Sequence, residues 1–183
     1  MKKKAIVLAS SRGIGKAIAD SLEEINYDVV RTSSKTLNTS DLPSVNGFIE
    51  DQVACDVLIL NTGGPPAKPF NEITEEDWSK YHNQLFLSFC TILQKLKIND
   101  EGFVFLISSS IIKEPIPNLI LSNSYRLAFT SVFKSLSKTY AERGITCINI
   151  APGPIKTDLL LNLVKDIQKF ENSLPLKRAG KPE

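Results

Sequence analysis

Five short apolar runs are spaced along this chain, and they constrain its fold more than any other feature. The runs cover Ala5–Ala9, Val29–Thr32, Val57–Leu60, Phe103–Ile107 and Thr146–Ile150. None of them alternates apolar with polar residues, and this is the pattern of strands that are covered on both faces. Helical patterns lie between the runs. Strands that alternate with helices predict an α/β fold, a doubly wound parallel sheet in three layers with helices on both faces.

Three longer segments carry the helical patterns. The expected helices are Gly15–Ile25, a helix from Thr74 to about Ile98, and a helix from about Leu119 to Arg143 that ends at Gly144. The second has the clearest beginning, because Thr74 is followed by Asp77 in the spacing of a capping box, and Ile73 and Trp78 are placed as a hydrophobic staple.

Composition excludes several classes of function. The net charge is +2 and the basic residues are scattered, so no nucleic-acid partner is expected. Cys55, Cys90 and Cys147 lie far apart without a CxxC pair or a histidine cluster, which argues against a metal site and fits a reducing compartment. No apolar stretch is long enough to be a signal-peptide core or to span a bilayer. We expect one cytoplasmic domain over residues 1–183.

The first apolar run leads into a glycine-rich turn, Ala9-Ser10-Ser11-Arg12-Gly13-Ile14-Gly15, and then into a helix. A strand-to-helix turn of this kind lets backbone N–H groups and the helix dipole meet a pyrophosphate. Gly13 permits close approach of the backbone, and Gly15 permits tight packing of helix on strand. A plain tight turn is the alternative. Its place after the first strand favours a dinucleotide-binding, Rossmann-like fold.

The segments SSRGIG, DVLILNTGG, FVFLISSS and RGITCINIAPGPIKTD follow one another in an order that resembles the short-chain dehydrogenase/reductase family. The likeness is greatest to its 3-oxoacyl-carrier-protein reductases and runs from about Lys4 to the last residue. The family's first turn reads TGxxxGxG, and Leu8 and Ala9 stand where its Thr and first Gly would be. Alanine there narrows the allowed backbone and adds one methyl group.

The resemblance implies a nicotinamide dinucleotide cofactor and a set of residues that bind it. The NTGG segment would flank the adenosine ribose, although a simple turn is the alternative there. The PG motif and the threonine after it would reach the nicotinamide carboxamide. The implied cofactor-binding residues are Ser10, Ser11, Arg12, Gly13, Ile14, Gly15, Asn61, Thr62, Gly63, Gly64, Ser108, Arg126, Pro152, Gly153, Ile155 and Thr157. Two alternatives remain for Asp41 and Leu42: they correspond to the family's pair of residues beside the adenine, or they have no counterpart in the family.

The residues after the second strand favour NADP(H). A carboxylate at this point would hold the ribose hydroxyls of NAD and repel a 2′-phosphate. The chain has no acid between Arg31 and Lys35, and it offers Ser33, Ser34 and Lys35, with Arg12 in the turn. Hydroxyls and cations suit a phosphate. NAD(H) remains possible if Arg12 and Lys35 are only solvated surface charges.

The catalytic positions that the resemblance implies are largely altered. The family uses a Ser, a Tyr thirteen residues later, a Lys four residues after the Tyr, and an Asn in the preceding helix. Ser109 matches the Ser, but the other three positions hold Ser122, Arg126 and Leu85. A serine hydroxyl is a far poorer acid than a phenol. Arginine cannot pass a proton on, although its fork can hold ribose hydroxyls or polarise a carbonyl.

Two other side chains are candidates for acid–base work, and packing explains both better. Tyr125 lies in the middle of an apolar stripe, so we expect it in a helix interface. His82 is the only histidine and has no recognisable partner, so we expect it on the surface or in packing.

Two functions remain. The first is an NADP(H)-dependent reductase of a small carbonyl compound, such as a 3-oxoacyl thioester or another apolar ketone, working through Ser109, Ser122 and Arg126. The second is a catalytically silent NADP(H)-binding homologue that acts as a sensor or partner subunit. The altered positions favour the second, and the intact turn and PG motif favour the first. The apolar segment Leu159–Glu171 indicates only an apolar carbonyl or alcohol substrate.

Three further expectations concern architecture. Ser33–Cys55 has 23 residues, too few for two crossovers around a third strand, so one family element should be missing there. The resemblance implies a homodimer or homotetramer through Glu75–Ile98 and Leu119–Arg143, and these helices are also rich in apolar residues, since Leu85, Phe86, Leu87 and Phe89 exceed what one buried face requires. The family's last helix and strand would follow Glu183, so the strand Thr146–Ile150 could have an open edge. The chain would then be part of a longer protein, or a short variant whose edge a partner covers.

Overall fold

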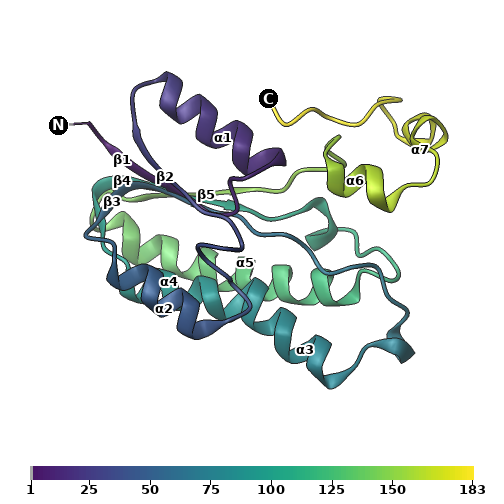
Figure 1. Ribbon diagram of the computed structural model, residues 1–183, viewed down its shortest axis with the longest axis horizontal. Helices are drawn as coiled ribbons and strands as arrows, with labels where there is room; N and C mark the ends of the chain where they lie inside the picture. Colours follow the sequence, from purple (N-terminus) through teal and green to yellow (C-terminus); the bar gives the residue numbers. More distant parts are fainter. Residues whose placement is uncertain (1) are drawn as a thin grey trace.

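The computed structural model describes residues 2–183, and at its centre is a parallel sheet of five strands (Figure 1). The strand order is β2-β1-β3-β4-β5, so β2 and β5 form the two edges. All five predicted strands are present, and the α/β fold class is confirmed. The strands are β1 (Lys4–Val7), β2 (Asp28–Arg31), β3 (Cys55–Leu60), β4 (Ile98–Ile107) and β5 (Thr146–Ile150).

Helices cover the two faces of the sheet unequally (Figure 1). One face carries α1 (Gly13–Glu24), and the opposite face carries α2 (Leu42–Glu50), α4 (Ser88–Lys95) and α5 (Ile120–Ala141). Successive residues of β1 enter different cores: Val7 packs with Ala19 of α1, whereas Ile6 packs with Phe89 and Phe129 of α4 and α5. This two-sided burial explains why the predicted apolar runs do not alternate apolar with polar residues.

The second predicted helix is interrupted and ends earlier than expected. It begins at Thr74 with the predicted capping box to Asp77 as α3 (Glu75–His82), and it passes through a π-helical turn over Asn83–Leu87 into α4. The helix ends at Lys95, and the prediction that it reaches Ile98 was wrong. Ile98 instead begins β4 and pairs with Cys55 ahead of an irregularity in the ladder.

The segment between β2 and β3 forms one helix, α2, and no strand. The expectation that it lacks an element is therefore confirmed. Asp41 occupies the N-cap of α2 without a side-chain cap bond, and Leu42 is its first residue.

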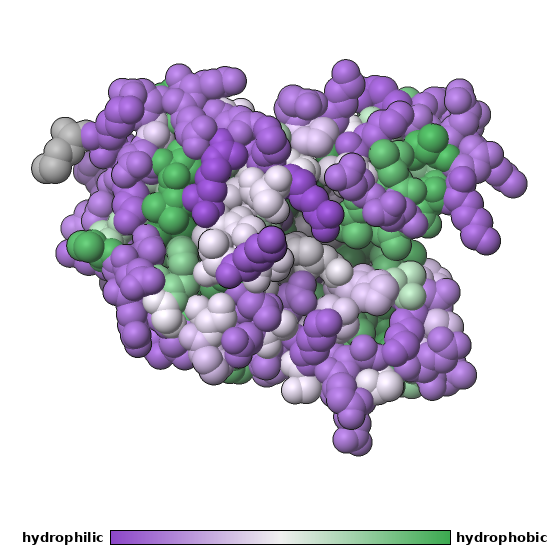
Figure 2. All heavy atoms as spheres, in the orientation of Figure 1, coloured by the Kyte–Doolittle hydropathy of each residue, from purple (hydrophilic) through white to green (hydrophobic). Residues whose placement is uncertain are grey.

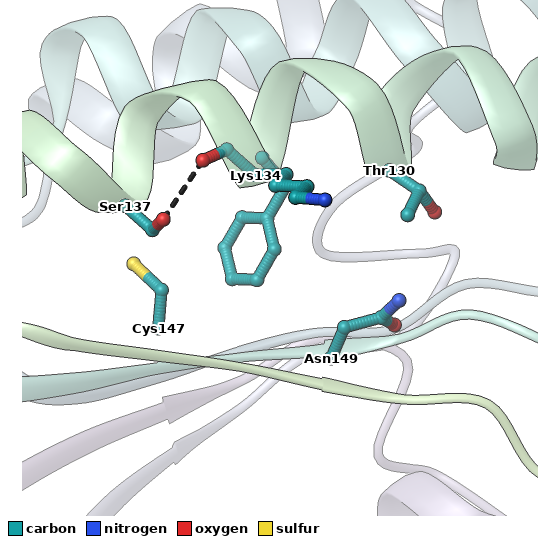
Figure 3. Close-up of a pocket in the computed structure, with 6 residues that line it drawn as sticks. Thr130, Lys134, Ser137, Cys147 and Asn149 are labelled. Atoms are coloured by element: carbon teal, nitrogen blue, oxygen red, sulfur yellow. Dashed lines mark hydrogen bonds between the residues drawn. The ribbon is translucent and has the colours of Figure 1, made fainter.

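The face that carries α1 is the more open one. A groove of about 410 Å³ runs between α1 and β3–β5, lined by apolar side chains that include Ile25, Phe103 and Ile150, and Pro182 and Glu183 reach it. A second cavity of about 190 Å³ lies between α5 and the edge strand β5. Figure 3 shows Cys147 and Asn149 of β5 facing the α5 side chains across it. None of the predicted catalytic residues lines either space.

The apolar run that suggested an oligomer is largely covered within the chain. Leu85 and Phe89 are buried, and Phe86 packs against the core. The sequence argument from this run was therefore wrong, and the oligomer needs other support. Among residues 2–183, no helix combines the length and the apolarity that crossing a bilayer requires.

Candidate functional site

The turn after β1 is held to the end of β2 by Thr32. The N–H of Ala9 donates to Thr32 Oγ1 at 3.0 Å, and the N–H of Ser10 donates to the Thr32 carbonyl at 2.8 Å. Ser10 Oγ accepts from the Thr32 N–H at 3.0 Å, so this buried hydroxyl serves the turn itself. Ala9 and Gly13 both have a left-handed backbone, with φ of 49° and 56°. Glycine meets this requirement freely, and alanine meets it at a cost.

Gly15 lies where the turn meets the NTGG segment. A Cβ at Gly15 would stand 2.3 Å from the Ala9 carbonyl oxygen and 2.7 Å from Asn61 Nδ2. That amide donates to the carbonyl of Leu8 at 3.3 Å. The Asn61 side chain therefore fastens the end of β3 to the end of β1, and only glycine fits between them.

The PG motif comes to the same place from β5. A Cβ at Gly13 would lie 3.2 Å from Thr157 Cγ2, so the motif's threonine stands directly over the turn. Pro152 accepts a hydrogen bond from the Ser110 N–H at 2.9 Å, which joins this segment to the loop after β4. Ile155 forms an isolated bridge with Gly180. Gly153 is exposed. The ends of β1, β3, β4 and β5 thus converge.

A dinucleotide fits the geometry of this turn. Helix α1 begins at Gly13, its N-cap residue Arg12 makes no side-chain cap bond, and its first turn contains no acid. The first N–H groups of a helix lack partners within it, and the helix dipole makes this end positive. With Gly15 allowing the strand and helix to approach, the turn provides the cradle that a pyrophosphate requires.

Three cationic side chains lie near the turn, and they differ in whether they can bind a ligand. Arg12 and Lys35 are exposed, and neither forms an ion pair within residues 2–183. Arg31 is committed elsewhere, because it binds Asp20 at 2.5 Å and Glu23 at 2.8 Å on α1. Within the loop, Ser33 Oγ accepts from the Lys35 N–H at 3.3 Å, and Ser34 and the turn residue Ser11 are exposed, whereas Ile14 is half-buried.

Arg126 extends from α5 to the carboxyl ends of β3 and β4. Its Nε donates to Ser122 Oγ at 3.1 Å, and its two terminal nitrogens donate to the carbonyls of Ile107 at 3.3 Å and Thr62 at 3.4 Å. A Cβ at Gly64 would lie 3.8 Å from the guanidinium. Burial lowers the pKa of Arg126 to about 10, so the group is cationic at neutral pH.

The remaining catalytic positions offer little acid–base chemistry. Ser122 is buried beside Arg126, and Leu85 lies in an apolar cluster with Tyr81 and Leu121. Ser109 Oγ accepts weakly from the Ile111 N–H at 3.4 Å. Its neighbour Ser108 is buried, and its hydroxyl donates to Asn149 Oδ1 at 2.6 Å, which ties β4 to β5.

Tyr125 is a packing residue, as the sequence predicted. Its hydroxyl donates to the Trp78 carbonyl at 3.0 Å. Its ring packs edge-on against the Trp78 ring, with the two ring centroids 5.8 Å apart. Burial raises the pKa of this phenol, which makes it a poorer acid. His82 stacks on Phe86 at 5.4 Å and also lies in packing.

Sequence reasoning missed Gln84. Its Nε2 donates to the Gly63 carbonyl at 2.9 Å and reaches Thr62 Oγ1 at 3.5 Å, and Thr39 Oγ1 shares a hydrogen bond of 3.1 Å with the same hydroxyl. Gln84 is next to the altered Asn position at Leu85 and lies in the π-helical turn. Such turns are frequent at functional sites, but the sequence gives no signal for one.

The geometry agrees with comparisons to known proteins. A family model described as enoyl-(acyl carrier protein) reductase matches residues 39–183, which is well over half of the chain. The chain belongs to the short-chain dehydrogenase/reductase family. Within residues 2–183, no group of His, Cys, Asp or Glu is arranged to hold a metal ion.

Relatives of this short-chain dehydrogenase/reductase span nearly its whole length. It is 27% identical to the 3-oxoacyl-[acyl-carrier-protein] reductase FabG of Buchnera aphidicola, over 98% of this chain and 84% of that protein. It is 23% identical to the NADPH-dependent reductase BacG of Bacillus subtilis, over 100% and 87%.

Solved structures share the fold over the same extent. A small-chain dehydrogenase in complex with NADPH is 25% identical, with a TM-score of 0.85 over 100% of this chain and 86% of that one. A short chain dehydrogenase family protein from Francisella tularensis has a TM-score of 0.89 at 19% identity, over 100% and 87%, and shows the fold alone.

Proposed function

We propose that this chain is an NADP(H)-dependent oxidoreductase that reduces a small, apolar carbonyl compound with a modified catalytic set. Ser109 keeps the family's Ser, and Ser122 and Arg126 stand in place of its Tyr and Lys. The observation that carries the proposal is the close packing of Thr157, which follows β5, against Gly13 in the glycine turn after β1, where Gly15 lets the helix approach the strand. Names of relatives support it, because they include 3-oxoacyl-carrier-protein and NADPH-dependent reductases.

The residues of the chain would have two roles, because some would hold the cofactor and others would bind and polarise the substrate carbonyl. When bound, the reduced nicotinamide supplies a hydride to the substrate. The turn and the start of α1 would hold the pyrophosphate, and Arg12, Ser33, Ser34 and Lys35 would meet a 2′-phosphate. Arg126 and Ser122 would hold the substrate oxygen through N–H and O–H donors.

The apolar segment after the PG motif supports an apolar substrate. Helices α6 (Asp158–Leu163) and α7 (Ile167–Ser173) follow Thr157 and lie beyond the carboxyl ends of the strands (Figure 1). Leu159, Leu161 and Leu163 of α6 are exposed. Figure 2 shows a hydrophobic area over this part of the molecule. A substrate that covered it would bury these side chains.

A binding titration followed by a substrate screen tests the proposal. NADPH and NADH are titrated at moderate salt, with nicotinamide fluorescence as the readout, and tighter binding of NADPH is expected. Carbonyl compounds are then screened for NADPH consumption. Tighter binding of NADH, or the absence of binding by either nucleotide, would contradict the proposal.

The alternative is a catalytically silent NADP(H)-binding homologue that acts as a sensor or partner subunit. Leu85 favours it, because a buried leucine stands where the family has a polar Asn. The alternative predicts tight NADPH binding without consumption on any carbonyl compound or alcohol in the screen.

We also infer a cytoplasmic protein, one dinucleotide-binding unit over residues 1–183, and a homodimer or homotetramer. Three free cysteines, of which Cys55 is buried, support a reducing compartment. The oligomer is supported by the resemblance to the family, which implies a contact through α5, and Leu127 on this helix has 51% of its surface exposed. Nothing in the charge pattern calls for a nucleic-acid partner.

A further inference from the structure

The guanidinium of Arg126 carries a positive charge that no carboxylate neutralises within residues 2–183. Its three acceptors are neutral oxygens, the hydroxyl of Ser122 and the carbonyls of Ile107 and Thr62. No ion pair of the described residues includes it, and burial lowers its pKa to about 10 with no acid to oppose the shift. Removing a cation from water without a counter-charge is costly. The arrangement therefore fits a group that receives an anion from a ligand.

The fork of Arg126 has N–H groups to offer and a ligand can reach it. A guanidinium has five N–H groups, so each terminal nitrogen keeps one N–H without a partner among the described residues. Arg126 as a whole is only half-buried, and Gly63, between the Thr62 and Gly64 that flank the fork, is exposed. Ligands of open α/β sheets bind outside the carboxyl ends of the strands, where this fork lies. A planar fork of N–H donors matches the two oxygens of a carboxylate.

The phosphates of the cofactor have their own place in the chain. The turn after β1 and the start of α1 form the cradle for a pyrophosphate, and the exposed Arg12 and Lys35 lie near it. Arg126 makes no hydrogen bond to that turn, because its partners lie on α5, at the end of β4 and in the loop after β3. This separation favours the substrate as the source of the anion.

Ser122 limits how far the anion lies from the carbonyl group that is reduced. Its Oγ accepts from Arg126 Nε at 3.1 Å and has no other partner within residues 2–183, so its own proton is left to donate. A carbonyl oxygen that accepts this proton lies next to the guanidinium. A carbonyl at Ser122 and a carboxylate at the fork therefore belong to adjacent carbon atoms, as they do in a 2-oxo acid.

We propose that Arg126 binds a carboxylate of the substrate, and that the substrates are 2-oxo acids with an apolar side chain. This inference rests on the proposed function and adds one charged group to its apolar carbonyl compound. The reaction stays the reduction of the carbonyl. The carbonyl carbon gains a hydride from the reduced nicotinamide, which is thereby oxidised, and the carbonyl oxygen gains a proton from water by way of Ser122. The product is the 2-hydroxy acid, whose carboxylate stays on the fork.

Calorimetric titration with 4-phenylbutanoate tests the carboxylate site without turnover. The matched neutral probe is 4-phenylbutanamide, which has the same apolar body and no charge. Both are titrated into the protein alone and into the protein saturated with NADP⁺, so that in the second case the cofactor occupies the pyrophosphate cradle. With NADP⁺ present, the carboxylate is expected to bind about tenfold more tightly than the amide, the equivalent of one charge-assisted hydrogen bond. Equal binding of the two probes, the absence of carboxylate binding, or carboxylate binding that NADP⁺ abolishes overturns the proposal.

Variants assign the preference for the carboxylate to the fork. Arg126→Gln is expected to abolish it, and Arg126→Lys, which keeps the charge but loses the fork, is expected to retain only part of it. Arg143→Gln is the matched control, because Arg143 binds Asp100 and the Ile98 carbonyl at the opposite end of the sheet. Far-ultraviolet circular dichroism checks that each variant is folded. An undiminished preference in either folded variant of Arg126 overturns the proposal.

The substrate class is tested with 2-oxo-4-phenylbutanoate and its ethyl ester, by NADPH consumption. The ester has the more reactive carbonyl, so a preference for the acid reports recognition of its charge. We expect kcat/KM to be about tenfold higher for the acid, and Arg126→Gln to reverse the order. An ester consumed as fast as the acid, or an acid that is not reduced, overturns the inference and leaves carbonyl reduction to the screen. A chain that binds neither nucleotide overturns the proposed function itself, and the titrations of the protein alone then still decide whether the carboxylate site exists.

Discussion

The backbone N–H of Ala9 donates to the side-chain oxygen of Thr32 at 3.0 Å while Ala9 itself has a left-handed backbone, with φ of 49°. The end of β2 thereby holds the turn in a conformation that its own residue disfavours. A left-handed backbone costs an alanine roughly 1–2 kcal/mol. Glycine avoids this strain, but part of the gain is offset because glycine loses more conformational entropy on folding.

Ala9→Gly is therefore expected to raise the free energy of unfolding by up to about 1 kcal/mol. Urea denaturation followed by circular dichroism measures the change. A lower free energy of unfolding in the variant would show that the methyl group of Ala9 packs favourably enough to outweigh the backbone strain.

Gly15→Ala is expected to destabilise the fold by roughly 1–3 kcal/mol, because its Cβ would stand 2.3 Å from the Ala9 carbonyl oxygen. NADPH binding should weaken with it. Gly47→Ala in α2 is the matched control: a Cβ there meets nothing within 4 Å, and alanine favours a helix by about 1 kcal/mol. Equal stability of the two variants would refute the close contact.

Arg12→Ala and Lys35→Ala are each expected to weaken NADPH binding by roughly tenfold, the equivalent of one charge-assisted hydrogen bond, and to leave NADH binding nearly unchanged. The loss should shrink as salt is added, because both side chains are exposed. Fluorescence titration at two salt concentrations provides the measurement. Lys95→Ala, which removes a side chain bonded to Asn46 between α2 and α4, is the control.

Tyr125→Phe is expected to lower the free energy of unfolding by about 1 kcal/mol, since it removes the hydrogen bond to the Trp78 carbonyl. Its turnover on any substrate found in the screen should match that of the parent protein. A folded variant that binds NADPH but no longer consumes it would place the phenol in the reaction.

The protein is expected to have a native mass above the 20.2 kDa of one chain at tens of micromolar. Leu127→Glu should shift it toward the monomer, because a carboxylate in an apolar contact between copies would lose its hydration. Light scattering after size exclusion measures both masses. A monomeric parent protein would contradict the contact.

Most of the sheet was predictable, because burial on two faces leaves a readable apolar run. The first half of β4 was not. Asn99 and the residues after it are polar, and they join the strand because Asn99 Nδ2 donates to Asp56 Oδ1 at 2.9 Å while Ile98 pairs with Cys55. That pairing depends on a distant segment, so the local pattern does not contain it.

The candidate site shows the same difference between residues that a local pattern predicts and residues that depend on distant contacts. Gly13 and Gly15 were predicted from spacing, because a turn with a left-handed backbone and a close contact requires glycine. The partners of Arg126 were not, since two of them are backbone carbonyls of distant segments, Ile107 at the end of β4 and Thr62 in the loop after β3. Gln84 was missed because the π-helical turn that places it beside Gly63 has no counterpart in residue spacing.

The strand order has a consequence for local opening. Strands β1 and β3 have a neighbour on each side, whereas within residues 2–183 β5 is bonded to β4 alone. Backbone amides of β1 and β3 should therefore exchange with deuterium more slowly than those of β5, since central strands open only with the whole fold. The glycine turn and the NTGG segment are anchored on the slow strands. Thr157, α6 and α7 follow β5, whose amides exchange faster. We therefore expect this segment to move away from the glycine turn while the turn and the NTGG segment stay folded.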